Sequence, residues 1–400
     1  MKLNQYFNKF FQSNQSSGVL LIFCVFFALI IANSSLGTGF QQILDYQLGF
    51  ENVDLKYPLS IWINDGLMAV FFLLVGLEIK RELVEGELSS FKNASLPIFA
   101  AVGGMVVPAV IYSIFNSGTE YSNGWGIPMA TDIAFSLAII SMLGKKVPAS
   151  LKIFLTALAI VDDLGAILVI AIFYTEQIHW IYLLLSVGIV AVLFILNFLK
   201  VTKLIFYIIP GIFLWYFLHH SGIHATIAGV LLALSIPTNV SKIKISPLEK
   251  LEHTLHFPVS FIIMPIFALT NTNITFNSGM VDGLFNSLGL GIIGGLVLGK
   301  LIGINLFSLI AVKLKVSALP QRSSWSQMLG VGLLAGIGFT MSIFIALLSF
   351  KHEVDFQDEA KFAILIASFI AAISGYVILN LSSKKRRKRK PRSTRRISSF

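Results

Sequence analysis

Two adjacent aspartates, Asp162 and Asp163, stand about halfway along an apolar stretch, 150–175. Neighbours on a helix point about 100° apart, so one carboxylate can face a partner while the other faces a cavity. Two carboxylates this close cannot both ionise at low cost in a low dielectric, so we expect at least one to hold a proton near neutral pH. Carboxylate oxygens also suit hard cations such as Na⁺ and Li⁺. The pair indicates competition between protons and an alkali cation; the alternative is a structural pair satisfied by hydroxyls or a lysine.

One basic residue, Lys300, lies within another apolar stretch, 288–311. A salt bridge to Asp162 or Asp163 would neutralise it, and breaking that bridge during exchange would couple binding to conformation. The alternative is a lysine that extends its amine to the membrane surface. The preceding residues match the phosphate-loop pattern G-x-x-x-x-G-K, but Leu301 replaces the magnesium-binding hydroxyl. We therefore expect no nucleotide-driven pump, no enzymatic activity and no cofactor.

Two further apolar stretches contain helix-breaking residues beside polar atoms. Thr131 and Asp132 follow GIPMA in 126–135, and Gly336 and Gly338 begin the motif GIGFTMSIF, 336–344. By the predicted topology these stretches run in opposite directions, a pattern typical of inverted repeats around a midplane site. Where half-helices meet, Asp132 could offset the positive N-terminal ends, as Lys300 could offset carbonyl ends. Direct ion binding by Asp132 is the other interpretation.

The composition requires lipid as the solvent for most of the chain. Of its 400 residues, 56% are hydrophobic and only 12% are charged, with a mean hydropathy of +0.81. We expect an all-α integral membrane protein with a single transmembrane domain, 19–381, between an N-terminal segment, 1–18, and a basic tail, 382–400. About twelve transmembrane helices are predicted: 19–36, 59–79, 96–115, 125–143, 150–175, 180–199, 204–219, 223–237, 257–271, 288–311, 327–350 and 360–381.

The basic residues predict the orientation. With alternate loops assigned to each side, 26 of the 30 Lys and Arg fall on the side of the N-terminus, and only Lys56, Lys351 and Lys361 on the other. This asymmetry predicts that both termini are cytoplasmic. Ten of the basic residues lie in the tail, which we expect to face anionic lipid headgroups. A specific partner or nucleic acid is the alternative use of the tail, and we expect no nucleic-acid binding.

Five motifs in order resemble the NhaA family of bacterial sodium/proton antiporters. They lie at 62–83, 130–135, 158–167, 221–229 and 336–344. The resemblance implies that Asp163 is the principal sodium carboxylate, that Asp162 pairs with Lys300, and that Thr131 and Asp132 lie close to the site. It also implies crossed, interrupted helices in the fourth and eleventh spans, and a homodimer in the bacterial inner membrane.

The same resemblance assigns pH sensing or ion entry to residues outside the dyad. It implies that Asp65 lies near the cytoplasmic funnel with Glu78 and Glu82, and that the segment 251–256 senses pH. Two histidines with an ordinary pKa near 6.5 suit that role; from the residues alone they are interfacial side chains. The assigned set is Asp65, Glu78, Glu82, His224, Glu252, His253 and His256. The long basic tail departs from the family pattern.

The predicted activity is exchange of intracellular Na⁺ or Li⁺ for external H⁺. Two protons per sodium would move net charge, and activity would rise at alkaline pH as carboxylates lose protons. A cation channel is an alternative, but a paired dyad in interrupted helices suits a binding site better. A symporter for an organic solute would need a larger polar cavity than the sequence suggests.

Overall fold

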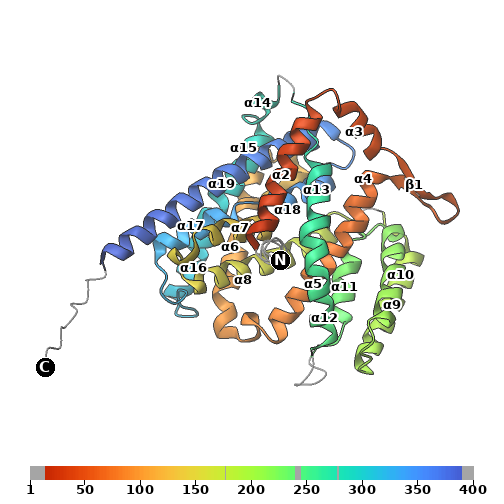
Figure 1. Cartoon of the computed structure of the whole chain (residues 1–400), viewed down its shortest axis with the longest axis horizontal. Helices are drawn as coiled ribbons and strands as arrows, with labels where there is room; N and C mark the ends of the chain where they lie inside the picture. Colours follow the sequence, from red (N-terminus) through yellow and green to blue (C-terminus); the bar gives the residue numbers. More distant parts are fainter. Residues whose placement is uncertain (1–13, 176, 239–244, 277–278, 390–400) are drawn as a thin grey trace, which may run out of the picture.

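The computed structural model describes residues 14–175, 177–238, 245–276 and 279–389, and within these ranges it is almost entirely helical (Figure 1). Residues 1–13 of the expected N-terminal segment and 390–400 of the expected basic tail lie outside the described ranges. The division into 1–18, 19–381 and 382–400 therefore stays a prediction.

The first half of the chain supplies a short hairpin and the helices that later carry the aspartates. Its elements are α2 (Asn14–Ala32), α3 (Gly37–Leu44), β1 (Gln47–Phe50), η1 (Glu51–Val53), β2 (Leu55–Pro58), α4 (Leu59–Ile61), η2 (Trp62–Leu67), α5 (Met68–Val84), η3 (Glu87–Ser89), α6 (Phe91–Asn116), η4 (Ser122–Met129), α7 (Ile133–Met142), η5 (Gly144–Lys146), α8 (Ala149–Phe173) and α9 (Trp180–Phe198).

All regular elements in the described residues of the second half are helices. Its elements are α10 (Ile205–Ser221), α11 (Ile227–Ser235), α12 (Pro247–Pro258), η6 (Val259–Ile263), α13 (Met264–Asn271), α14 (Met280–Gly283), α15 (Ser287–Ile293), η7 (Gly294–Gly299), α16 (Lys300–Lys313), α17 (Trp325–Ala335), α18 (Phe339–Ser349) and α19 (Val354–Arg389).

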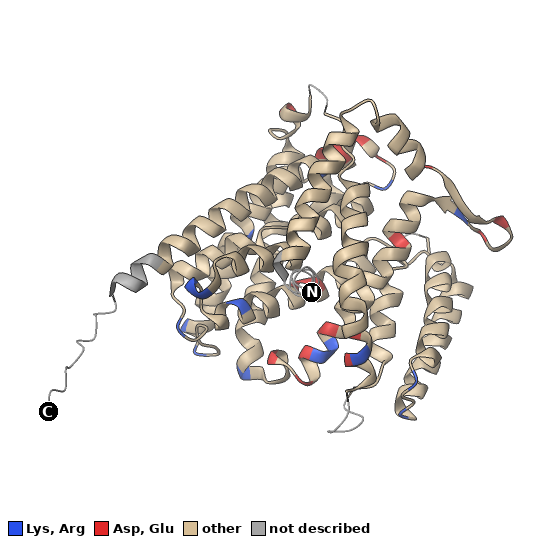
Figure 2. Cartoon of the chain, viewed as in Figure 1, with Lys and Arg blue, Asp and Glu red and all other residues tan. Residues whose placement is uncertain are grey.

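The described helices are those of a multi-pass membrane protein. Eight of them are long and apolar enough to cross a bilayer, and ten if the bent pairs α2–α3 and α17–α18 each count as one span. A bilayer needs about 20 apolar residues per helix, which α10 and α11 do not reach alone. Lys, Arg, Asp and Glu lie mainly at the ends of helices, and few lie in the helix bodies (Figure 2). The count of twelve spans stays a prediction.

One helix begins earlier than its predicted span, 257–271. The helix that contains α12 and α13 begins at Pro247, because Ser246 accepts from Glu249 N–H at 3.2 Å and the Glu249 carboxylate accepts from Ser246 N–H at 2.8 Å. This reciprocal capping box starts a helix at a polar sequence that hydropathy assigns to a loop. The segment 251–256 is therefore helical.

The structure also contains a β-hairpin, which the sequence analysis does not predict. Strands β1 and β2 pair antiparallel, with Gln47 opposite Pro58 and Phe50 opposite Leu55. The hairpin projects from one end of the molecule, where Figure 1 shows it beside α4. We call this the hairpin end, and the opposite end, where α5 finishes beyond Arg81, the Arg81 end. Because the strands are short and contain polar residues, a search for apolar spans does not detect them.

The two interrupted stretches lie against each other. Chain 130–132 is extended between η4 and α7, and α17 and α18 meet at a 45° bend. Asp132 N–H donates to Ile337 O at 2.7 Å, and Ser136 Oγ donates to Leu334 O at 2.9 Å. Ser342 Oγ donates to Ile127 O at 2.7 Å. Each break thus satisfies backbone groups that the other leaves without a helical partner.

Small residues bring the remaining helices close to this centre. A Cβ on Gly103 of α6 would lie 2.3 Å from the carbonyl oxygen of Gly303 on α16, so the two backbones touch. Gly336 likewise packs on η7, where an added Cβ would lie 2.2 Å from Leu296 O. Such close packing is the main attraction between helices in lipid, and it places the start of α16 beside the breaks.

Gly336→Ala should therefore destabilise the protein. The added methyl group would collide with backbone rather than with a flexible side chain, and overpacking of this kind costs about 1–3 kcal/mol. We expect a lower midpoint of thermal unfolding for the purified protein in detergent. Gly188→Ala on α9 is the matched control, because a Cβ there meets nothing within 4 Å. Equal midpoints for both variants would contradict the packing argument.

Candidate functional site

A buried ion pair joins α8 to the start of α16. Lys300 Nζ contacts Asp162 Oδ2, and both side chains are completely inaccessible. Thr131, in the extended chain between η4 and α7, lies 2.6 Å from the same carboxylate oxygen and 3.0 Å from Lys300 Nζ. Its hydroxyl also lies 2.7 Å from Ala335 O at the end of α17. Since a hydroxyl has one proton, Thr131 can donate to only one of the two oxygens at a time.

Asp163 is the next residue of α8, about 100° further round the helix, and it also lies within the protein. Its side chain is buried, and its Oδ1 has no hydrogen-bond partner among the described residues; the same is true of Asp162 Oδ1. Buried polar atoms are almost always satisfied in folded proteins. Two orphaned carboxylate oxygens on adjacent residues are acceptors for a proton or a hard cation.

A cavity of about 290 Å³ leads from Asp163 toward the Arg81 end. It passes Asp132 and Thr340 at the breaks and reaches Glu78 and Arg81 on α5. The Arg81 side chain is 35% exposed, whereas Asp163 is 1% exposed, so the cavity connects surface with core. An ion entering here would meet Asp163 at the buried end.

Asp132 lies at the N-terminal ends of two helices. Its Oδ1 accepts from Phe135 N–H in α7 at 3.0 Å, while its Oδ2 accepts from Thr340 N–H in α18 at 3.2 Å and from the Thr340 hydroxyl. A carboxylate in this position caps both helices and offsets the positive field of both N-termini. Asp132 also lines the cavity, so the same carboxylate that caps the helices is within reach of an entering ion.

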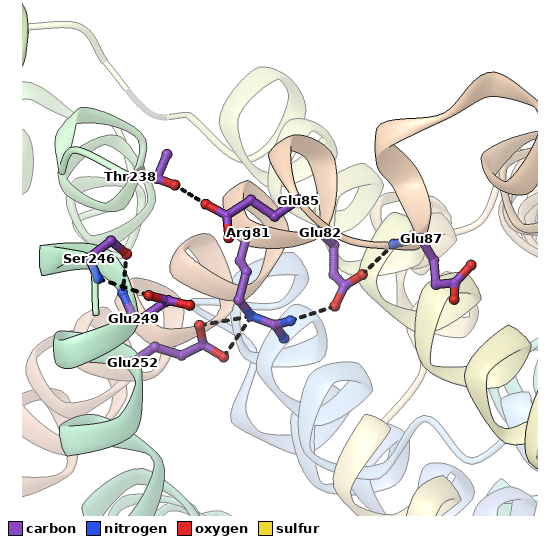
Figure 3. A network of polar contacts seen from close by, with 8 residues as sticks. All are labelled: Arg81, Glu82, Glu85, Glu87, Thr238, Ser246, Glu249 and Glu252. Atoms are coloured by element: carbon purple, nitrogen blue, oxygen red, sulfur yellow. Dashed lines mark hydrogen bonds and ion pairs between the residues drawn. The ribbon is translucent and has the colours of Figure 1, made fainter. Parts of the chain in front are cut away.

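Charged residues of α5 and α12 form a network of ion pairs and hydrogen bonds at the Arg81 end, as Figure 3 shows. Arg81 Nε lies 3.0 Å from Glu252 Oε2, and Arg81 Nη1 lies 2.9 Å from Glu82 Oε1. Glu82 also accepts from Glu87 N–H at 3.0 Å. The network fixes the side chain of Arg81 where it lines the cavity.

Segment 251–256 contributes unequally to this end. Glu252 pairs with Arg81, and His256 lines the cavity, but His253 is exposed and is not among the lining residues. Glu252 and His256 lie four residues apart, so they share one face of α12. The structure thus brings two of the three predicted residues together with Glu78.

Asp65 is not part of that group, which corrects its expected place beside Glu78 and Glu82. It lies in η2, thirteen residues before Glu78 on one continuous helix, which corresponds to about 20 Å. Its carboxylate instead faces His219 Nδ1 at 3.3 Å and His224 Nε2 at 3.6 Å, toward the hairpin end. The sequence reasoning missed His219. A search for histidines able to face a membrane aspartate would have raised it as a candidate.

Aromatic rings separate Asp65 and its histidines from the cavity. The ring of Phe344 packs edge-on to His224 at 5.3 Å between centroids, and it also contacts Phe72 at 5.5 Å and Phe267 at 6.4 Å. All three phenylalanines are fully buried. Phe344 follows cavity-lining Thr340 by one helical turn, so the packed rings close the protein between the cavity and the hairpin end.

The chain is similar to known proteins along nearly its whole length. A family model described as Na⁺/H⁺ antiporter 1 matches residues 8–379. The Na⁺/H⁺ antiporter NhaA 2 of Flavobacterium johnsoniae is 59% identical over 383 residues, covering 95% of this chain and 93% of that protein. The NhaA antiporter of Flavobacterium psychrophilum is 51% identical (95% and 97% covered), and that of Pelagibacter ubique is 48% identical (96% and 99% covered).

The buried ion pair predicts an asymmetric effect of substitution. Lys300→Met should leave Asp162 buried without its counter-charge, and loss of one partner of a buried pair costs about 3–5 kcal/mol. The double variant Lys300→Met with Asp162→Asn removes both charges and should recover much of that loss. Unfolding midpoints of the purified proteins measure both effects. If the double variant were as unstable as the sum of the single variants, the two groups would not be coupled.

Proposed function

Because the chain belongs to the Na⁺/H⁺ antiporter 1 family, we propose that it exchanges Na⁺ for H⁺ at Asp162 and Asp163. The resemblance to NhaA antiporters that the motifs indicated is confirmed by the matches along the chain. The observation that carries the proposed site is the pair of orphaned carboxylate oxygens at the buried end of the cavity. They offer acceptors that a proton or a sodium ion can occupy.

Asp163 is the principal ligand in this proposal. It lines the cavity, whereas Asp162 is turned toward Lys300 and Thr131. Protonated Asp163 cannot coordinate a cation well, and a bound cation repels the proton, so the two ligands exclude each other. When Na⁺ draws the Asp162 carboxylate, Lys300 loses its counter-charge, which links occupancy to rearrangement around α16.

Exchange requires that the site opens to one side at a time. We propose that about twelve spans form inverted repeats whose fourth and eleventh members cross at their interruptions. Mutual hydrogen bonds between the breaks support this arrangement. A cavity that reaches the Arg81 end, together with packed rings toward the hairpin end, describes a conformation open to one side. Movement of α7 and α18 would reverse it.

Orientation follows from the basic residues. We propose that both termini and the Arg81 end face the cytoplasm of a bacterium across its inner membrane, and that the basic tail contacts anionic headgroups. Two protons entering for each Na⁺ leaving would move one net charge inward, so the membrane potential would drive export. Li⁺ would follow the same route, since its coordination chemistry is similar. Two copies would form a homodimer.

Control by pH would reside at the cytoplasmic mouth. Glu78 and His256 line the cavity, and Arg81 is held by Glu82 and Glu252. Protonation of any of these acidic or imidazole groups changes the charge that an entering cation meets. We propose that loss of protons at alkaline pH raises the activity through this group, to which His253 adds from the exposed face of α12.

Asp163→Asn should abolish exchange. An amide keeps the size of the side chain but cannot ionise, so it neither carries a proton nor supplies a negative ligand. In everted membrane vesicles, addition of Na⁺ should fail to dequench an acid-trapped pH dye. Glu120→Gln, an exposed acidic residue away from the cavity, is the control and should behave as wild type. Wild-type rates from Asp163→Asn would overturn the site assignment.

Competition also predicts how sodium affinity depends on pH. While the dyad is protonated, one proton must leave for each sodium bound, so a rise of one pH unit on the cytoplasmic side should lower KM for Na⁺ about tenfold, or about a hundredfold if two protons leave. The effect should level off once the carboxylates are ionised. Dequenching rates at several pH values and Na⁺ concentrations measure it. A constant KM with a changing maximal rate would exclude direct competition.

A further inference from the structure

A second polar cluster lies outside the cavity, toward the hairpin end. One carboxylate, Asp65, stands between two imidazoles: its Oδ2 faces His219 Nδ1 at 3.3 Å and its Oδ1 faces His224 Nε2 at 3.6 Å. The three side chains are 22%, 15% and 12% exposed, respectively. They are therefore partly withdrawn from solvent but still accessible to protons.

Three separate segments build this cluster. Asp65 lies in the π-helical turn η2, and His219 lies in the last turn of α10. Gly222, with φ of 87°, ends α10 in the left-handed conformation and turns the chain, so that His224 comes back to the same carboxylate. A left-handed residue at this position favours glycine. The cluster thus depends on a built turn rather than on two mobile side chains.

Hydrogen bonds decide how protons are distributed within it. His224 Nδ1 lies 2.8 Å from the Thr226 hydroxyl and 3.4 Å from Thr226 N–H, which can only donate. His224 Nδ1 is thus assigned as an acceptor, which leaves the ring proton on Nε2, toward Asp65. Adding a proton to His224 would cost these bonds. Among the described residues no donor is bonded to the His219 ring, so His219 can accept an additional proton without losing such a bond.

The surroundings of the cluster carry few other charges. Lys351 is close enough to act on Asp65, and Asp54 and Tyr216 act on the nearby Tyr57. The rings of Tyr57, Trp215 and His220 pack on His219, with centroids at 5.0, 5.7 and 5.3 Å. Aromatic faces favour a cation, whereas Lys351 opposes one. Asp65 is thus the acidic partner in direct contact with His219.

We propose that Asp65, His219 and His224 form a proton-binding site on the outward face, in which His219 holds the proton that arrives from outside. The inference rests on the proposed exchange and orientation. It gives the incoming proton a place to bind before the rings of Phe72 and Phe344 part, and it separates proton arrival from sodium arrival at the Arg81 end. The chemistry is that of imidazole and carboxylate; no group of three or more His, Cys, Asp or Glu within the described residues could hold a metal ion.

The test compares His219→Gln with His220→Gln in proteoliposomes whose internal and external pH are set separately. His220 also packs edge-on to His219, at 5.3 Å between centroids, but its Nδ1 lies 2.9 Å from Tyr216 O and Asp65 pairs with His219 and His224 instead, so His220 is the matched control. A partly exposed ion pair contributes modestly. We therefore expect His219→Gln to raise the outward proton concentration for half-maximal exchange about two- to fivefold, with KM for Na⁺ unchanged. His220→Gln should match wild type.

A second measurement does not depend on transport. Trp215 stacks on His219, so protonation of that imidazole should quench its emission. The difference in fluorescence between the wild type and Trp215→Phe should change with pH, and His219→Gln should remove that titration. An unchanged titration, or an unchanged proton dependence in a protein that still exchanges, would overturn the inference. Failure of wild-type exchange with a normal titration would instead overturn the proposed function alone.

Discussion

The arrangement of side chains in the buried site depends on one constraint: a charge inside the membrane must be neutralised by another group of the same protein. Even the mildest scale gives a cost of about 2.5–3.5 kcal/mol for one charged residue at the bilayer centre. Lys300 and Asp162 meet that constraint for each other, with Thr131 bridging them, while both side chains are completely inaccessible. Because this pair occupies Asp162 Oδ2 alone, Asp163 and the second oxygen of Asp162 are left to change partners. A site that exchanges ions needs an unsatisfied group next to charged side chains that already neutralise each other.

The backbone around the aspartates comes from broken helices, because only broken helices expose backbone groups at this depth in the membrane. Asp132 binds N–H groups at the start of α7 and α18, and Thr131 and Ser136 reach the last carbonyls of α17. An unbroken helix has all of its backbone groups satisfied and offers none of these contacts. The breaks therefore bind each other. Any movement of one must be matched by the other, which is the kind of two-state element that alternating access requires.

Each end of the molecule carries its own set of titratable groups. Glu78, Arg81, Glu252 and His256 surround the cavity mouth, whereas Asp65, His219 and His224 lie beyond the packed rings of Phe72 and Phe344. This separation gives a carrier different chemistry on its two faces. A carboxylate-rich mouth attracts a cation, and a histidine-rich one can take up protons.

The sequence by itself determined the class of the protein, the dyad, the lysine and the two breaks. These features are readable because charges, glycines and prolines are rare in membrane helices and interrupt long apolar stretches visibly. From the residues alone, either aspartate could have been the partner of Lys300, and only the packing of α16 against α6 and the breaks brings Asp162 to it. In the tertiary structure Asp65 lies beside His219 instead of Glu78, and Glu252 pairs with Arg81. A capping box and a hairpin also form in segments where hydropathy predicts no membrane span. The contacts of Asp65 with His219 and of Glu252 with Arg81 link residues distant in the chain, and their geometry depends on how whole helices pack; the capping box and the hairpin are local, but a search for apolar spans does not detect them.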